Sequence, residues 1–320
     1  MKALQGVDGH VAWVEAERPA CDAGQVRIRV AAAGLNRADL LQRAGLYPPP
    51  PGASPYMGLE CSGIVEEVGA GADWRVGDRV CALLAGGGMA EEVVVDARHV
   101  LPVPEGLSLH EAAAVPEVYA TAWLNIFQLG ALKAGEKVLV HAGASGVGSA
   151  AIQLCKAFGN PVWVSGGSPQ RLAYCQSLGA VGGVVRNGNL DDLEQLGPFD
   201  VILDPVGASY GPLNLKLLAR DGRWVIIGLM GGRKVELDLA LVLGKRLEIT
   251  GSTLRNRDDA FKAQLLQELR QQVWPLFAEG RLSPQLVDTY PVAFAEAAYA
   301  ELASNQVSGK LVLVIDPTLV

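Results

Sequence analysis

The chain has 320 residues, 50% of them hydrophobic and 19% charged. A chain of this composition buries a large core, which excludes a disordered protein and leaves room for two domains. Its 27 basic and 34 acidic residues give a net charge of −7, so we expect no nucleic acid partner. No apolar run reaches membrane-spanning length and the N-terminus lacks a hydrophobic signal core, so we expect a cytoplasmic protein with no membrane partner.

The first third of the chain predicts short β-strands separated by glycine and proline. These strands are residues 2–5, 11–16, 25–31, 63–67, 79–84 and 90–95. Asn36 precedes a predicted helix over 37–44, where it either caps this helix or contacts a ligand. Four prolines, 48–51, follow Tyr47 and either hold it for a pocket or form a surface spacer. Ser108 caps a further short helix.

The stretch 138–154, VLVHAGASGVGSAAIQL, predicts a nucleotide-binding turn between an apolar strand and a helix over 149–158. Glycines let the backbone approach a pyrophosphate, and the helix N-terminus offers unpaired N–H groups and the positive end of its dipole. In a G-x-G-x-x-G frame the middle glycine is replaced by a serine whose hydroxyl is suited to a phosphate. The predicted pyrophosphate contacts are Gly143, Ser145, Gly146, Val147 and Gly148.

From residue 137 onward, apolar strands alternate with helices, which is typical of a parallel sheet covered on both faces. The strands are 138–142, 162–165, 183–186, 200–203, 223–228 and 247–251, and the later helices begin after Ser168 and cover 190–196 and 210–219. The fold class is therefore α/β, a Rossmann doubly wound parallel sheet with a second, β-rich domain, and the ligand is expected at the carboxyl ends of the strands. An amphipathic helix follows over 258–277, and the tail strand, 309–315, is expected to return to the first third.

The charges after the glycine turn favour NADPH over NADH. An NAD site usually has Asp or Glu about 20 residues after the turn, but no acidic residue lies between Glu136 and Asp191. Gly167 and Ser168 instead follow the second strand, with Arg171 and Arg186 beyond them. A guanidinium and a capped helix N-terminus suit the 2′-phosphate of NADPH. The alternative is that the serine only caps and both arginines are solvated.

Taken together, these motifs resemble the zeta-crystallin type of quinone oxidoreductase, a zinc-free group of the medium-chain dehydrogenase/reductase superfamily, and within it the branch induced by a tumour-suppressor protein. The resemblance rests on GLNRADLLQRAGLYPPPPGAS, GLECSGIVEEVG, GDRVCALLAGGG, AAAVPEVYATAW, HAGASGVGSAAIQL, DGRWVIIGLMGG, GSTLRNR and VSGKLVL. It implies a GroES-like substrate domain, residues 1–118 and 259–320, around a Rossmann domain, residues 119–258. It also implies NADPH as reductant and a homodimer. The strand in LEITGSTL, expected at the sheet edge, either pairs with its twin in that dimer or is covered by a loop.

The same resemblance implies roles for individual residues. Asn36 and Tyr47 match the catalytic positions beside the nicotinamide and substrate, and Asn36 also counts as a coenzyme contact. Further coenzyme contacts are implied at Gly228, Leu229, Met230, Ser252, Leu254 and Lys310. Two residues depart from the family pattern: Arg171 stands where relatives often have Lys, and Arg186 where they often have Tyr. Both arginines remain compatible with a phosphate.

The residues predict no metal site. Zinc relatives have Cys where this chain has Asn36 and His where it has Leu59, and their four-cysteine lobe has no counterpart after Asp78. The five cysteines contain no Cys-x-x-Cys pair, so we expect reduced, mostly buried thiols. Of the four scattered histidines, His141 lies in a predicted central strand and is interpreted as a core residue.

We therefore expect an NADPH:quinone oxidoreductase that works without zinc and binds a small-molecule quinone over the nicotinamide in the cleft between the domains. No Ser/His/Asp arrangement or spaced carboxylate pair is present. A quinone needs little acid catalysis, so Tyr47 and Asn36 are predicted to orient its carbonyl. Transfer by hydride or by single electrons stays open. The alternatives are an enoyl or alkenal reductase, or a low-activity NADPH-binding protein with a regulatory or structural role.

Overall fold

The computed structural model describes residues 1–186 and 192–319, and the chain forms two compact units. Unit 1 comprises Met1–Ala120 and Leu254–Val320, and unit 2 comprises Thr121–Thr253. The sequence placed the corresponding divisions at residues 118 and 258, a few positions away. Helix α3 (Pro116–Trp123) runs through the first division without a loop, so no local break in the sequence marks it.

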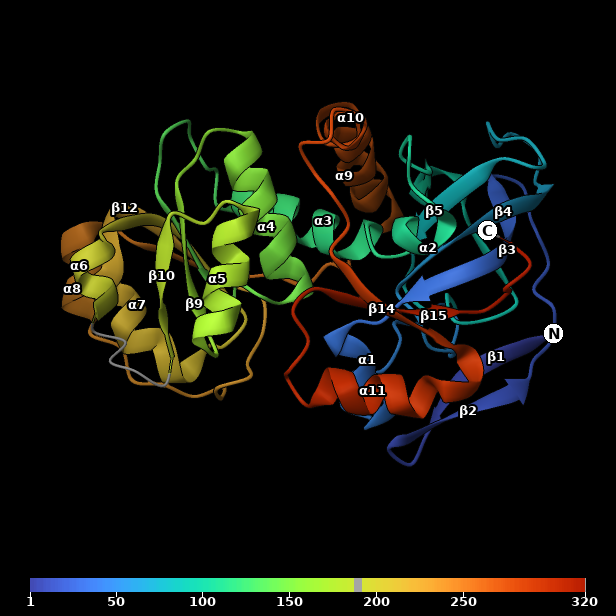
Figure 1. Ribbon diagram of the computed structural model, residues 1–320, viewed down its shortest axis with the longest axis horizontal. Helices are drawn as coiled ribbons and strands as arrows, with labels where there is room; N and C mark the ends of the chain where they lie inside the picture. Colours follow the sequence, from blue (N-terminus) through green and yellow to red (C-terminus); the bar gives the residue numbers. More distant parts are fainter. Residues whose placement is uncertain (187–191, 320) are drawn as a thin grey trace. The chain divides into compact units, whose positions relative to one another are not determined.

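Unit 1 is built around an antiparallel sheet that joins both ends of the chain. Its strand order is β14-β15-β3-β4-β5-β7, with β6 also paired to β3, and a separate hairpin is formed by β1 and β2. The strands are β1 (Lys2–Val7), β2 (His10–Glu15), β3 (Gln25–Gly34), β4 (Glu60–Val68), β5 (Arg79–Leu83), β6 (Glu92–Asp96), β7 (Val100–Pro102), β14 (Leu286–Pro291) and β15 (Lys310–Val314). In Figure 1 the red strand β15 lies beside the blue strand β3, and Leu313 pairs with Ala33. The tail therefore returns to the first third of the chain, as predicted.

The helices of unit 1 differ from the prediction in one region. They are α1 (Arg37–Arg43), η1 (Ala97–His99), α2 (Leu109–Ala112), α3, α9 (Asp259–Gln272), α10 (Trp274–Ala278), η5 (Val292–Phe294) and α11 (Ala295–Ala303). The single helix predicted over 258–277 is wrong, because the chain breaks at Val273 into α9 and α10. Pro275 explains the break, since proline has no N–H for the helical bond and its ring crowds the preceding turn.

Unit 2 contains a parallel sheet whose strand order is β10-β9-β8-β11-β12-β13. The strands are β8 (Val138–His141), β9 (Val162–Gly166), β10 (Gly182–Val185), β11 (Phe199–Asp204), β12 (Leu218–Ile226) and β13 (Glu248–Gly251). The helices are η2 (Leu124–Leu129), α4 (Gly146–Ala157), α5 (Pro169–Leu178), α6 (Leu193–Leu196), η4 (Ala208–Tyr210), α7 (Gly211–Leu217) and α8 (Leu239–Lys245). The order reverses between β8 and β11, so the predicted doubly wound fold is confirmed and its switch point lies at the ends of these two strands.

Several element boundaries in unit 2 also shift. Helix α4 begins at Gly146 rather than 149, because the serine of the glycine turn occupies its N-cap. Helix α7 ends at Leu217 and β12 begins at once, so the predicted extension of that helix to 219 is wrong. The predicted helix over 190–196 starts outside the described residues. Strand β13 lies at the sheet edge as predicted, and its pairing with a second copy stays a prediction.

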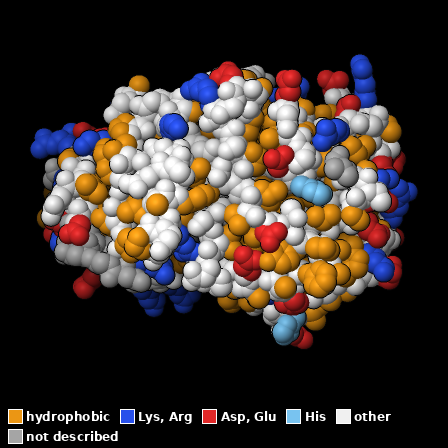
Figure 2. All heavy atoms as spheres, viewed as in Figure 1, with side chains coloured by type: hydrophobic (Ala, Val, Ile, Leu, Met, Phe, Trp, Pro, Cys, Tyr) orange, Lys and Arg blue, Asp and Glu red, His pale blue; other side chains and the backbone are white. Residues whose placement is uncertain are grey.

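The surface is mixed in charge. On the face drawn in Figure 2, acidic and basic side chains are interspersed, and hydrophobic side chains gather around the β1–β2 hairpin. Within residues 1–186 and 192–319, none of the helices combines the length and apolar character needed to cross a bilayer.

Candidate functional site

The glycine turn after β8 leads directly into α4. The Ser145 hydroxyl oxygen accepts a hydrogen bond from the Gly148 N–H at 3.1 Å and so caps the helix. A Cβ on Gly148 would lie 2.5 Å from the Gly143 carbonyl oxygen, and one on Gly143 would lie 2.6 Å from Val164 Cγ1. Both positions therefore require glycine, and the turn packs tightly enough to point the first N–H groups of α4 outward at the switch point.

The next strand end collects basic side chains. Ser168 caps α5 by accepting from the Arg171 N–H at 3.3 Å, and a Cβ on Gly167 would lie 3.0 Å from Arg171 Nη1. Arg186 follows β10, which pairs with β9, and its side chain is exposed. Burial and then the charge of Arg186 lower the pKa of Arg171. Two guanidinium groups thus lie beside a capped helix N-terminus, where an anion is stabilised.

The ends of β11, β12 and β13 lie at the same edge of the sheet. A Cβ on Gly228 would lie 2.7 Å from the Pro205 carbonyl oxygen, so the two loops pass at close range. Leu229 and Met230, which follow, are 56% and 47% exposed. The Ser252 hydroxyl is buried and has no hydrogen-bond partner among the described residues. An unpaired buried hydroxyl at a strand end is suited to a polar ligand group such as a carboxamide.

A buried hydrogen-bond network connects these strand ends beneath the turn. His141 bonds Ser165 Oγ through Nδ1 at 2.9 Å and Asn214 Oδ1 through Nε2 at 2.8 Å. The Asp204 carboxylate accepts from Asn214 Nδ2 at 3.0 Å and from Trp224 Nε1 at 2.9 Å. Since the amide oxygen of Asn214 faces the ring, Nε2 of His141 donates and Nδ1 accepts. Burial lowers the pKa of His141, and the prediction of a core residue is confirmed.

In unit 1 the predicted residues Asn36 and Lys310 meet in a buried charged cluster. The Lys310 ammonium donates to Leu35 O at 2.6 Å, Asn36 Oδ1 at 2.8 Å and Glu60 Oε1 at 2.6 Å. Asn36 Nδ2 donates to Glu60 Oε1 at 2.9 Å, and the Glu117 N–H donates to Glu60 Oε2 at 2.9 Å. Lys310 is 3% exposed and Glu60 0%. Glu60 was missed by the sequence analysis, although it stands in the quoted segment GLECSG.

This cluster changes the interpretation of Lys310 and Asn36. All three protons of the Lys310 ammonium have acceptors within the protein, so a coenzyme contact by this residue stays a prediction that requires it to give up one bond. Asn36 is the N-cap of α1 and forms a capping box with Asp39. Its side chain also bonds Glu60 and Lys310. Asp39 accepts from the Asn36 N–H at 2.8 Å, and burial raises the pKa of Asp39 to about 7. Its other carboxyl oxygen is buried without a partner among the described residues.

Tyr47 is held by an arginine that the sequence analysis did not assign. The Arg255 guanidinium lies 5.1 Å from the centre of the Tyr47 ring and donates to the Tyr47 carbonyl at 3.1 Å. It also donates to Ala85 O at 2.7 Å and Gln42 Oε1 at 2.7 Å, and it is 5% exposed. Tyr47 is half-buried, and burial raises its pKa. The buried Leu254 precedes Arg255, so this short segment fixes the ring by stacking and by backbone contacts.

Zinc does not fit at Asn36. Both ends of its amide are engaged, and the neighbouring positive charge is already that of Lys310. Tetrahedral zinc needs about four N, S or O donors, and the residue after Gly58 is the apolar Leu59. Across the described ranges, nowhere do three His, Cys, Asp or Glu side chains gather as metal ligands do. The cysteines are free thiols, four of them buried.

Two known family profiles match the chain. The profile described as "Alcohol dehydrogenase GroES-like domain" matches residues 22–105. The profile described as "Zinc-binding dehydrogenase" matches residues 146–271. The first match falls within unit 1 and most of the second within unit 2.

Among curated proteins, the synaptic vesicle membrane protein VAT-1 homolog of Danio rerio is 33% identical over 98% of this chain and 68% of its own length. The polyketide synthase GfsB of Streptomyces halstedii is 34% identical over 97% of this chain, which spans only 5% of that synthase. The chain likewise spans 14% to 18% of several mycobacterial synthases.

Solved structures match over the full chain. The quinone oxidoreductase of Pseudomonas syringae pv. Tomato DC3000 aligns with a TM-score of 0.86 at 28% identity, covering 98% of this chain and 99% of that one. The CurK enoyl reductase aligns with a TM-score of 0.85 at 28% identity over the same shares. An NAD-dependent alcohol dehydrogenase aligns with a TM-score of 0.86 at 28% identity, covering 99% of this chain and 100% of that one.

Proposed function

The chain belongs to the medium-chain dehydrogenase/reductase superfamily of oxidoreductases, whose members bind nicotinamide coenzymes, and we propose that it is an NADPH:quinone oxidoreductase. The observation that carries the coenzyme choice is the pair Arg171 and Arg186 beside the Ser168 cap. Two guanidinium groups at a capped helix N-terminus suit a bound dianion such as a 2′-phosphate.

The residues present fit this coenzyme. The N–H groups at the start of α4 would hold the pyrophosphate, and Ser168 with the two arginines would hold the 2′-phosphate. The loop at Gly228 and the unpaired Ser252 hydroxyl would hold the nicotinamide end. When bound, NADPH supplies the reducing equivalents, as a hydride or as single electrons, and water supplies the proton that completes reduction of a quinone.

Within unit 1, Tyr47 is proposed to orient the acceptor, and Asn36 is proposed to fix the shape of the site beside it. The Tyr47 hydroxyl has a raised pKa because of burial, so it stays protonated near neutral pH and is able to donate a hydrogen bond to a carbonyl oxygen. Arg255 holds its ring in one position, which lowers the entropy lost on binding. Asn36 is immobilised by Glu60 and Lys310, so its role is to shape the site.

A second candidate is an enoyl reductase acting on an enal or an unsaturated thioester. Its support is the CurK enoyl reductase among the structural relatives and the polyketide synthases among the curated ones. A quinone and an enone share a carbonyl conjugated with a double bond, so the same orienting residues suit both. A third possibility is an NADPH-binding protein without turnover.

The deciding experiment measures NADPH oxidation by the full chain with a para-quinone, an ortho-quinone and a 2-alkenal at matched concentrations. Quinone values of kcat/KM that exceed the alkenal value support the proposal. A higher alkenal value supports the enoyl reductase. NADPH binding by calorimetry without oxidation of any acceptor supports the non-catalytic protein.

A further inference from the structure

Unit 1 contains a cavity of about 1030 Å³ between β6, η1, the start of β7 and α9. Its walls are partly apolar, formed by Trp74, Leu83, Leu84, Val95, Leu101 and Leu266. None of the residues predicted for coenzyme or catalysis lines it. The volume is in the range of pockets that hold drug-sized ligands.

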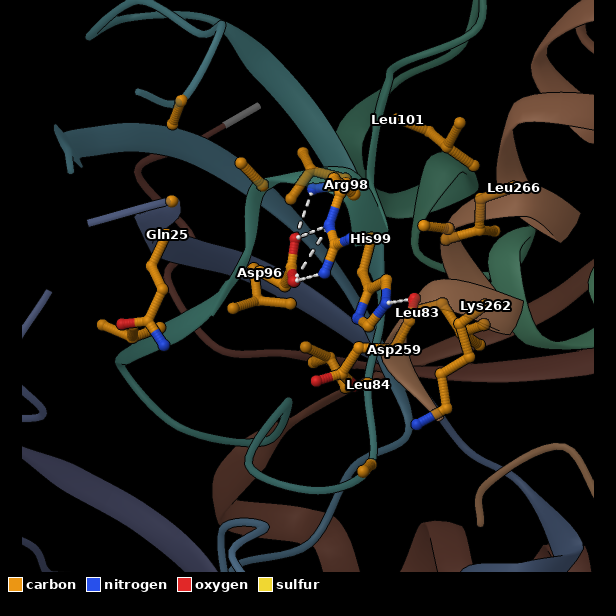
Figure 3. Close-up of a pocket in the computed structure, with 18 of the residues that line it drawn as sticks. Gln25, Leu83, Leu84, Asp96, Arg98, His99, Leu101, Asp259, Lys262 and Leu266 are labelled. Atoms are coloured by element: carbon orange, nitrogen blue, oxygen red, sulfur yellow. Dashed lines mark hydrogen bonds and ion pairs between the residues drawn. The ribbon is translucent and has the colours of Figure 1, made fainter. Parts of the chain in front are cut away.

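Lys262 lines this cavity and is a buried lysine whose ammonium is not paired with a carboxylate of the described residues. It lies in the first turn of α9 and is only 5% exposed. Within residues 1–186 and 192–319, its ammonium makes no hydrogen bond or ion pair. Figure 3 shows its side chain extending from the helix, with the nitrogen clear of the other labelled groups and joined to none by a dashed line.

Lys310 is buried to a similar degree, and it differs from Lys262 in the number of hydrogen-bond acceptors around its ammonium. The Lys310 ammonium has three acceptors, including Glu60. Lys262 Nζ is not among the fully buried polar atoms without a partner, so its stem is packed while its ammonium reaches the open space of the cavity. Burial lowers the pKa of Lys262, while Asp259 and Glu117 act from a distance to raise it.

Some of the other polar groups of the cavity are already paired. Asp96 binds the Arg98 side chain, with Arg98 Nη2 to Asp96 Oδ2 at 2.6 Å. His99 Nε2 bonds the Asp259 carbonyl at 2.9 Å. Figure 3 shows these pairs on the wall formed by η1 and α9. Of the cationic side chains that line the cavity, Arg98 is paired and Arg270 is exposed, which leaves the buried Lys262 for an anionic ligand.

From this arrangement we propose that the cavity is a binding site for an organic anion, a molecule with one carboxylate on an apolar or aromatic body. The carboxylate accepts hydrogen bonds from Lys262, and the body packs against Trp74 and the leucines. A charge-assisted bond of this kind is stronger than one between neutral groups. The site does not depend on the proposed reduction of quinones.

The test is calorimetry of the full chain, without coenzyme, using 2-naphthoate and its uncharged counterpart 2-naphthylmethanol. We expect naphthoate to bind the wild type, and Lys262→Met to weaken that binding by about 10-fold or more. Lys262→Arg should retain most of the affinity. Lys2→Met makes the same chemical change at an exposed lysine of unit 1 and should leave it unchanged.

The melting temperature of Lys262→Met, which keeps the packed stem, shows whether the variant is folded. The proposal is overturned if millimolar naphthoate gives no heat with the wild type, or if Lys262→Met binds it as tightly. It is also overturned if naphthylmethanol binds the wild type as well as naphthoate does, since the charge would then have no role.

Discussion

Lys310 in unit 1 and the pair Arg171 and Arg186 in unit 2 are basic side chains predicted at the coenzyme site, and their surroundings differ. Lys310 is almost fully buried, and its ammonium is saturated by three acceptors. The two arginines lie close enough for one to lower the pKa of the other, and Arg186 is exposed. A buried pair of opposite charges stabilises the fold, whereas two like charges near each other favour the binding of an anion from solution. This difference is the basis for proposing a structural role for the first group and ligand recognition for the second.

The largest expected effect is on stability, from Lys310→Met. The change leaves the Glu60 carboxylate buried without its cation, which costs about 3–5 kcal/mol in the free energy of unfolding. Urea unfolding followed by circular dichroism measures this loss. Arg186→Met, the matched change in unit 2, should stay within about 0.5 kcal/mol of the wild type.

A double variant, Glu60→Gln with Lys310→Met, removes both charges and should recover part of the loss. Equal unfolding free energies for Lys310→Met and Arg186→Met would remove the contrast between the two regions.

The next effect is on coenzyme selectivity, from Arg171→Glu. A carboxylate repels the 2′-phosphate, so KM for NADPH should rise by about 100-fold while KM for NADH changes little. Steady-state kinetics with each coenzyme measure the change in KM for NADPH and for NADH. A parallel rise for both coenzymes contradicts a 2′-phosphate site at Arg171.

A smaller effect concerns the dependence of stability on pH. Burial raises the pKa of Asp39 to about 7 in the folded protein, above its value in the unfolded chain of about 3.9. The folded state therefore holds a proton that the unfolded state has released, and the stability contributed by Asp39 is lost as pH rises through this window. Asp39→Asn does not titrate, so its unfolding free energy relative to wild type should be higher at pH 8 than at pH 5. A difference that is the same at both pH values would refute the raised pKa.

The smallest effect is expected from Tyr47→Phe. If Tyr47 only orients the acceptor, kcat should fall by less than about 10-fold, with a rise in the KM for quinone. Pre-steady-state mixing with quinone separates binding from turnover. Loss of turnover with unchanged quinone binding would make Tyr47 an obligatory proton donor.

Local features of the fold were predictable from sequence. The glycine turn and the Ser168 cap depend on neighbouring residues only, and the structure confirms both elements. The strand alternation after residue 137 likewise predicted the parallel sheet, because period and turn signals are local. The break at Pro275 had a local signal too, but the amphipathic pattern on both sides concealed it.

Long-range contacts were not predictable. Lys310 and Glu60 are 250 positions apart, and nothing in either motif indicates that they pair. Arg255 lies 208 positions from Tyr47, so its role became evident only from the folded chain. The family resemblance named the residues of the candidate site. Burial and hydrogen bonding within unit 1 determine which of their polar groups remain available to a ligand.

The central proposal is that unit 2 binds the 2′-phosphate of NADPH through Arg171 and Arg186. Calorimetric titration of the wild-type chain with NADPH and with NADH tests this most directly. The account predicts that NADPH binds at least about 10-fold more tightly. Equal affinities, or no heat of binding with NADPH, would contradict it.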